Sequence, residues 1–272
     1  MSSRKDEARE WARSVIGNHL PRTARKFSLA MYVGEASVSS ALGIQFDLHP
    51  AEGKVVELTL DWILLKIGRS AEFFVVAREL VDVVPELGAV VRITPYARRG
   101  FDGCRLDAPR EEAWGNGVRI STIHLGESRS VLPIDKDTIQ SPFLRDMIDQ
   151  VEGLSAHDGM RCLSQVLVDA GACLAPVEYV DPGDAHIIAT PPALKFRVRT
   201  AKHEGWIEIR YDRAADTYTV VLTAPDGGLV FEREGVYFDN LAESVVGLID
   251  DGRWRIATVE ILKPAPRRAL AA

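Results

Sequence analysis

A series of short apolar runs between residues 53 and 96 constrains the fold more than any other feature of this sequence. The runs are rich in Val, Ile, Leu and Phe and read KVVELTL, DWILLKIG, EFFVVAREL and AVVRITPYA. Turn-forming residues separate them at 52–53, 68–70 and 85–88. Such runs are typical of short antiparallel strands. With a further run, GVRISTIHL, they predict a small antiparallel β-barrel of the OB or SH3 kind within residues 31–126.

An amphipathic helix is predicted near the N-terminus. Between residues 5 and 20 apolar side chains recur at helical spacing, and Pro21 favours an end to the helix. Residues 1–26 carry seven basic and three acidic groups, a net charge of +4. Residues 1–30 are therefore either a basic segment that docks on a partner or a helix whose stripe around Trp11 packs on its own domain. The second interpretation is simpler, because amphipathic helices usually serve a core.

A helical hairpin with its connector is predicted over residues 127–185. Pro142 suits the first position of one helix, which ends near Gly153. Ser155 and Asp158 have the spacing of a capping box, and the apolar residues that follow predict a second helix from Met160 onward.

A C-terminal α+β domain is predicted over residues 186–264. The runs LKFRVRT, GWIEIRYD, TYTVVLTA and LVFERE predict strands. Asp239 suits the N-cap of a packed helix, WRIATVEIL predicts a last strand, and residues 265–272 a flexible tail. The expected class is therefore α+β, with an N-terminal helix, a small barrel, a helical hairpin and a C-terminal sheet with one helix.

Composition and charge restrict the function. The chain has 272 residues, 46% of them hydrophobic, and its net charge of −6 leaves −10 outside residues 1–26. An acidic chain does not suit a general nucleic-acid coat, although a local basic site is still possible. Cys104, Cys162 and Cys173 have no paired spacing, so neither a disulfide framework nor a zinc site is expected. The N-terminus lacks a secretory pattern, and no run suits a membrane span, so we expect a cytoplasmic protein without a membrane partner.

The sequence contains no recognisable catalytic motif. His157-Asp158 has the residue types of a metal-dependent phosphohydrolase dyad, but the capping role explains the pair more simply. The G-x-S-x-S stretch at 126–130 departs from the G-x-S-x-G nucleophile elbow, and there is no phosphate-binding glycine loop. We therefore expect no enzyme activity, no cofactor and no metal ion.

The loop TPYARRGFDGCRLDAPR, at residues 94–110, is the candidate binding site. In small barrels, aromatic side chains stack on bases while arginines contact phosphates. That chemistry assigns Tyr96, Arg98, Arg99, Phe101 and Arg105 as nucleic-acid-binding residues. In the alternative, the two aromatics anchor the loop while its arginines pair with Asp102 and Asp107. The alternative is slightly favoured, because the whole chain is acidic.

Residues 53–96 resemble the KfrB-type small barrel module carried by plasmids. The resemblance lies in the GKVV start, the polar-Gly turn and the closing xxPxxGxxVxI pattern. The segments TPPALKF and VYFDNLAESVVGLIDDGRW add a broader resemblance to accessory proteins of plasmids, phages and integrative elements. The resemblance implies a mobile-element context and a link to nucleic acid, and it carries over no catalytic residue.

Two functions are therefore expected. The first is a mobile-element accessory protein that binds single-stranded nucleic acid through the barrel and its basic loop. The second is a protein-interaction module, such as an inhibitor of a host defence protein, because the acidic remainder can face a basic partner. The sequence makes no prediction of the oligomeric state.

Overall fold

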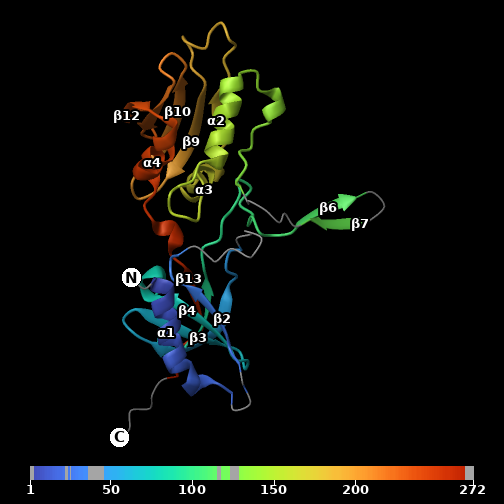
Figure 1. Ribbon diagram of the computed structural model, residues 1–272, viewed down its shortest axis with the longest axis vertical. Coiled ribbons are helices and arrows are strands. Elements are labelled where there is room, and N and C mark those ends of the chain that lie inside the picture. Colours follow the sequence, from blue (N-terminus) through green and yellow to red (C-terminus); the bar gives the residue numbers. More distant parts are fainter. Residues whose placement is uncertain are drawn as a thin grey trace. The chain divides into compact units, whose positions relative to one another are not determined.

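The computed structural model describes residues 3–21, 24, 26–35, 46–114, 118–122 and 129–266 (Figure 1). The chain forms two compact units. The first contains the described residues up to 35, those from 46 to 97 and those from 253 onward; the second contains residues 98–252. The N-terminal helix and the last strand thus belong with the first sheet, and the helical hairpin belongs with the second. The two units therefore group the helices and strands differently from the domains expected from the sequence.

The first unit contains a mixed six-stranded sheet in the order β1-β4-β3-β2-β5-β13. β1 is parallel to β4, and the other neighbouring strands are antiparallel. The class of mixed helix and sheet and the N-terminal helix are confirmed. No pairing among the described strands joins β1 to β13, so the expected closed barrel is not found. The strands are β1 (Ser28–Tyr32), β2 (Ala51–Leu58), β3 (Trp62–Ile67), β4 (Glu72–Ala77), β5 (Val90–Thr94) and β13 (Thr258–Lys263).

Helix α1 (Arg4–Ile16) packs on this sheet. The Ser3 hydroxyl accepts a hydrogen bond from the Asp6 backbone N–H at 3.2 Å, which caps the helix N-terminus. Ala8, Ala12 and Ile16 are buried in the core of the first unit. Trp11 stacks on Trp62 of β3, with ring centroids 6.4 Å apart. The helix therefore serves its own domain, as the simpler interpretation of the sequence held.

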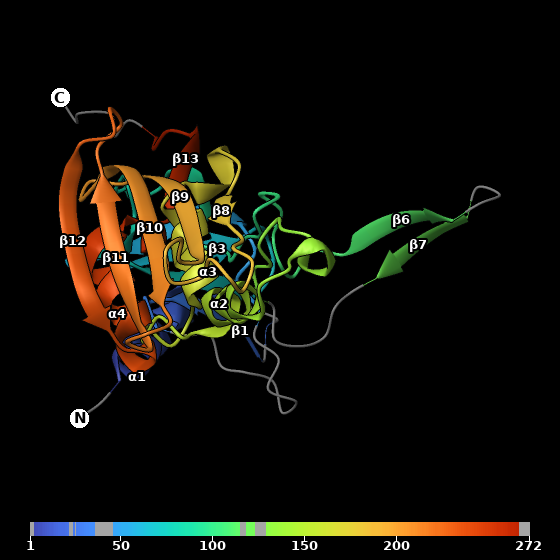
Figure 2. The same ribbon diagram turned by 90° about the horizontal axis from the view of Figure 1, so that it is seen from above.

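The second unit contains a five-stranded antiparallel sheet in the order β12-β11-β10-β9-β8. Three helices pack against one face, on alternate residues such as Leu194, Phe196, Ile207 and Ile209 (Figures 1 and 2). The helices are α2 (Pro142–Gly153), α3 (Leu163–Asp169) and α4 (Phe238–Ile249); the strands are β8 (Glu178–Val180), β9 (Ala193–Arg199), β10 (Glu204–Asp212), β11 (Thr217–Thr223) and β12 (Leu229–Val236).

Four expectations from the sequence are wrong in detail. Helix α4 begins at Phe238 with Tyr237 as its N-cap, so Asp239 lies in the first turn and is not the cap. The second helix begins at Leu163 with Cys162 as its N-cap, so Ser155 and Asp158 do not form its capping box. The run GVRISTIHL does not join the first sheet, because β7 (Val118–Thr122) pairs with β6 (Arg110–Trp114) in a separate hairpin. The last strand, β13, was expected in the C-terminal domain, but it pairs with β5 in the first unit.

Candidate functional site

The two aromatic residues of the candidate loop are anchored in different units. Tyr96 belongs to the first unit, where its ring meets Trp254 edge-on with centroids 4.6 Å apart. Phe101 belongs to the second unit, where it packs against the core and lies 6.5 Å from the ring of Phe196. Both rings are half-buried. These contacts match the alternative interpretation, in which the aromatics anchor the loop.

The arginines of the loop differ in their surroundings. Arg98 is buried, with 6% of its surface exposed. Arg105 makes a two-pronged contact with Asp107, with nitrogen–oxygen distances of 2.7 and 2.8 Å. Arg99 is exposed and donates to the Gly103 carbonyl at 2.8 Å. Of the five predicted residues, Arg99 therefore offers the most accessible charge to an anion.

Another aromatic and basic group lies beside Tyr96 and was not selected from the sequence. Trp254, which contacts Tyr96, is flanked by the exposed residues Arg253 and Arg255. Tyr32 lies close as well, because its hydroxyl donates to the Arg255 carbonyl at 2.7 Å. The sequence does show the basic and aromatic triplet 253–255. Its proximity to Tyr96 cannot be predicted from it, because the chain leaves the first unit at residue 97 and rejoins it only at residue 253.

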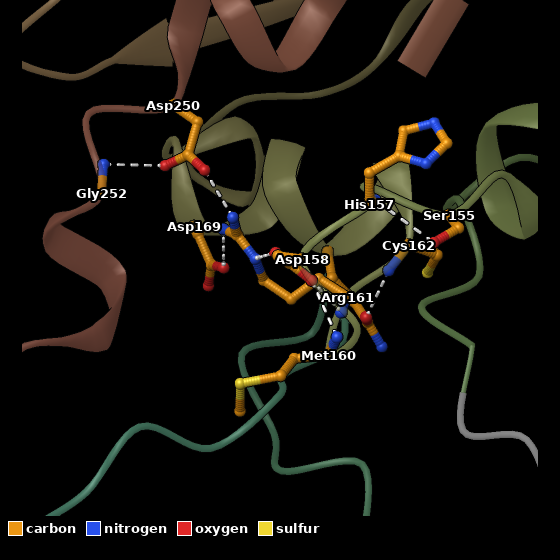
Figure 3. Close-up of polar contacts among 10 residues, drawn as sticks. Ser155, His157, Asp158, Met160, Arg161, Cys162, Asp169, Asp250 and Gly252 are labelled. Atoms are coloured by element: carbon orange, nitrogen blue, oxygen red, sulfur yellow. Dashed lines mark hydrogen bonds and ion pairs between the residues drawn. The ribbon is translucent and has the colours of Figure 1, made fainter. Parts of the chain in front are cut away.

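A buried ion cluster surrounds Arg161 in the second unit (Figure 3). The side chain of Arg161 is 1% exposed and pairs with Asp158 at 2.7 Å, with Asp169 at 2.9 Å and with Asp250. Asp158 also accepts hydrogen bonds from the backbone N–H groups of Met160 and Arg161, both at 2.8 Å. The cluster joins the turn before α3 to the C-terminal ends of α3 and α4, which is a structural task.

The pKa of Arg161 is raised above its ordinary value. Burial alone lowers this pKa, but hydrogen bonds to Asp169 and Asp158 and the nearby negative charge outweigh the effect of burial. The three carboxylates therefore favour the charged form of the guanidinium despite its burial.

His157 takes no part in this cluster. Its ring points away from Arg161 and the three carboxylates, and its backbone N–H donates to Ser155 Oγ at 3.2 Å (Figure 3). The geometry of a metal-binding His-Asp dyad is therefore not formed by His157 and Asp158. Within the described part of the chain, no three His, Cys, Asp or Glu side chains gather as they would around a metal ion.

Strand β12 is an exposed edge of the second sheet. It is the last strand in the sheet order, so its outer backbone groups have no neighbouring strand in the described chain (Figure 2). Seven of its eight residues are exposed, including Leu229 at 64% and Val230 at 57%. The first three residues of β12, up to Phe231, are apolar, and the next three are charged. Sheet edges pair readily with another strand unless charges protect them, so the apolar start of β12 is its accessible part. This edge is therefore a candidate binding surface.

A groove follows the same strand on the side of α4. It has a volume of about 510 Å³ and lies between the β12 residues Phe231 and Arg233 and the α4 residues Asn240, Glu243 and Leu248. The groove carries both charges and apolar surface. It extends the β12 edge into a surface that can receive side chains as well as backbone.

The fold and these surfaces define a two-unit α+β protein with an accessible sheet edge and a basic, aromatic loop region. Comparison with family models, with curated proteins and with solved structures finds no match for this chain. No helix in the described residues is both long and apolar enough to cross a membrane.

Proposed function

We propose that this chain is a non-enzymatic protein-interaction module whose second unit receives an extended segment of a partner protein along β12. The observation that carries the proposal is the exposed apolar edge at Leu229 and Val230. An added strand gains main-chain hydrogen bonds, and side chains in the adjacent groove supply specificity. The mobile-element context and the cytoplasmic location are parts of this proposal, and the context is supported by the resemblance of residues 53–96.

The charges of β12 favour a different protein over a second copy of this chain. In a symmetric antiparallel pair of identical strands, one residue lies opposite its own copy. Pairing over the whole of β12 puts Glu232 opposite Glu232 or Arg233 opposite Arg233. Like charges directly opposite each other destabilise a sheet. We therefore expect a partner strand with basic residues opposite Glu232 and Glu234.

The proposal is tested with charged substitutions at the edge. The partner is captured with the wild-type chain and identified, and its affinity is measured for L229K/V230K and for I261K. Lysines at the edge block strand addition, so L229K/V230K should weaken binding by about tenfold or more, or about 1.4 kcal/mol. Ile261 is an exposed edge residue of β13 in the first unit and serves as the matched control.

Hydrogen exchange locates the contact independently. The amides of β12 should gain protection when the partner binds, whereas those of β13 should not. Equal affinity of the wild type and L229K/V230K would show that the partner binds elsewhere. Dimer formation by the free chain in light scattering, if abolished by L229K/V230K, would show that a second copy covers the edge.

Nucleic-acid binding is the second candidate function, and Trp254 is the observation that favours it. In the first unit Tyr96 and Trp254 lie together beside the exposed residues Arg253 and Arg255. The test measures binding of labelled single-stranded DNA and RNA at two salt concentrations. A salt-sensitive affinity that falls in R253A/R255A supports the candidate, and R99A tests the loop arginine of the second unit on its own. Lack of binding at low salt excludes it.

A further inference from the structure

A separate pocket in the second unit has an aromatic floor. It has a volume of about 370 Å³ and opens between α2, the β10–β11 hairpin and the start of α4. Phe143 of α2 stacks on Tyr211 with centroids 5.6 Å apart, and Tyr211 lies 5.4 Å from Tyr218. Tyr218 is buried, while the other two rings are half-buried. The pocket thus exposes ring surface from three elements.

Two more aromatic side chains line the pocket at the start of α4. Tyr237 is 64% exposed and Phe238 is 46% exposed. Aromatic rings bring a large apolar surface, so leaving two adjacent ones in water is unfavourable unless another surface covers them. Their exposure beside the pocket is a second observation that points to a ligand.

Three carboxylates line the same pocket. Asp146 lies on α2, Asp216 in the hairpin turn and Asp239 in the first turn of α4, and all three are exposed. Asp216 accepts a hydrogen bond from the Tyr211 hydroxyl at 2.7 Å. Asp239 offsets the positive end of the α4 dipole, which would otherwise repel a cation. The carboxylates therefore make the mouth of the pocket electronegative.

In the described chain, one cationic side chain packs on a ring of this pocket. The guanidinium carbon of Arg213 lies 5.0 Å from the centroid of Phe143, so one aromatic face already accepts a guanidinium group. One Arg against three carboxylates leaves a formal charge of −2. The pKa of Tyr218 is raised mainly by burial; the hydrogen bond with Gln150 lowers it, and the charges of Asp216 and Asp146 raise it further.

We propose that this pocket binds an organic cation that carries N–H donors, namely an ammonium or guanidinium group. Aromatic faces attract cations through their quadrupole, and carboxylates accept the N–H hydrogen bonds that a quaternary ammonium cannot donate. The cation comes either from a free amine or guanidine or from a Lys or Arg side chain of a protein. The pocket shares Tyr237 with the groove beside β12, but the three carboxylates and the stacked rings of the proposal do not line that groove.

The test titrates the full-length protein with blocked arginine, Nα-acetyl-arginine methylamide, and follows amide shifts by NMR. The matched probe is blocked citrulline, which has nearly the same shape and no charge. Arginine should bind with shifts at residues 143–150, 211–218 and 237–239, and its affinity should fall with salt. Equal binding of citrulline, or no saturable binding of arginine, overturns the proposal.

Two variants are expected to change the affinity for blocked arginine in opposite directions. A general loss of stability would not produce this pattern. D146N/D216N should weaken the affinity for blocked arginine by about fivefold or more, whereas R213Q should strengthen it by removing an internal competitor. D212N is the matched control, because Asp212 lies in the same turn and accepts from the Ala214 and Ala215 N–H groups without lining the pocket. Unchanged affinity in both D146N/D216N and R213Q overturns the proposal.

Two further arms identify the source of the cation and keep this proposal distinct from strand addition. A pentapeptide with a central arginine that binds about tenfold tighter than blocked arginine identifies a protein side chain as the source; equal affinities identify a free ligand. L229K/V230K should bind blocked arginine as the wild type does. If it does so while losing the protein partner, the two sites are independent.

Discussion

At the scale of single residues, Arg161 is the buried cation that three carboxylates share. R161M removes the cation and keeps the length of the side chain, so Asp158, Asp169 and Asp250 would lose the positive charge that they share. We expect the free energy of unfolding to fall by about 3–5 kcal/mol, the cost of breaking a buried ion pair from one side. Urea unfolding measures this loss.

An exposed ion pair provides the comparison for Arg161. Arg9 pairs with Asp6 at 3.1 Å on the surface of α1, and both side chains are exposed. R9M should change the free energy of unfolding by less than about 1 kcal/mol. Similar losses in R161M and R9M would contradict the assignment of the Arg161 cluster as a main stabilising contact of the second unit.

Tyr211 should report the charge of the cation pocket through its ionisation. Burial and then the hydrogen bond with Asp216 raise the pKa of Tyr211 to about 12. The raised pKa stabilises the fold fully below pH 10, the pKa of a free tyrosine, and this contribution is lost as the pH rises through 12. In D216N the negative charge is gone, so the absorbance of this tyrosinate should develop at lower pH. Y211F identifies the tyrosine, and an unchanged titration in D216N would contradict the contribution of Asp216 to the raised pKa.

The candidate loop shows what sequence can predict about single residues. The pairing of Arg105 with Asp107 could be expected, because the two residues lie two positions apart in one loop. The contact of Tyr96 with Trp254 could not, because it joins chain segments more than a hundred residues apart, and nothing in the loop sequence indicates that Arg98 is buried. Local pattern gives the residue types of a site, while tertiary packing decides which of them stay accessible.

At the scale of elements, Gly205 is needed for the close pairing of β10 with β11. Its φ of +148° lies in a region that favours glycine, and an added Cβ would lie 2.0 Å from the Thr223 carbonyl oxygen. G205A should therefore lower the free energy of unfolding by more than about 2 kcal/mol.

Gly247 of α4 gives the opposite case. A Cβ added there meets no atom within 4 Å, so G247A should stabilise the helix by up to about 1 kcal/mol. Thermal unfolding of both variants checks that G205A destabilises the protein and that G247A stabilises it.

The elements themselves were easier to predict than their partners. The strands of residues 53–96 and 193–236 follow from apolar runs and turns, because these signals are local. The start of α3 was missed, since Asp158 instead bonds to Arg161 in the turn before the helix. The pairing of β13 with β5 was missed for another reason: an edge strand with mixed burial can complete either sheet, and its own sequence does not say which.

At the scale of the whole molecule, the two units should differ in their ability to fold alone. The described residues of the second unit all lie within residues 98–252, and they include every member of its hydrophobic cluster. The first unit depends on the C-terminal segment, because Ala257 and Val259 belong to its core and the Ala257 N–H donates to the Leu80 carbonyl at 2.7 Å. The fragment 98–252 should therefore unfold cooperatively, whereas the fragment 1–97 should be sensitive to protease.

Restoring the missing strand distinguishes this explanation from a general weakness of the first unit. A chain in which a flexible Gly-Ser linker joins residue 97 to residue 253 regains β13, and with it the pairing to β5 and the hydrogen bond from the Val259 N–H to Asp82 at 2.8 Å. This chain should resist protease and unfold cooperatively in urea, as measured by circular dichroism. If the fragment 1–97 unfolds with the same midpoint as the linked chain, β13 is not required. A lower midpoint for the fragment would show that folding of the first unit depends on a strand synthesised only after residues 98–252.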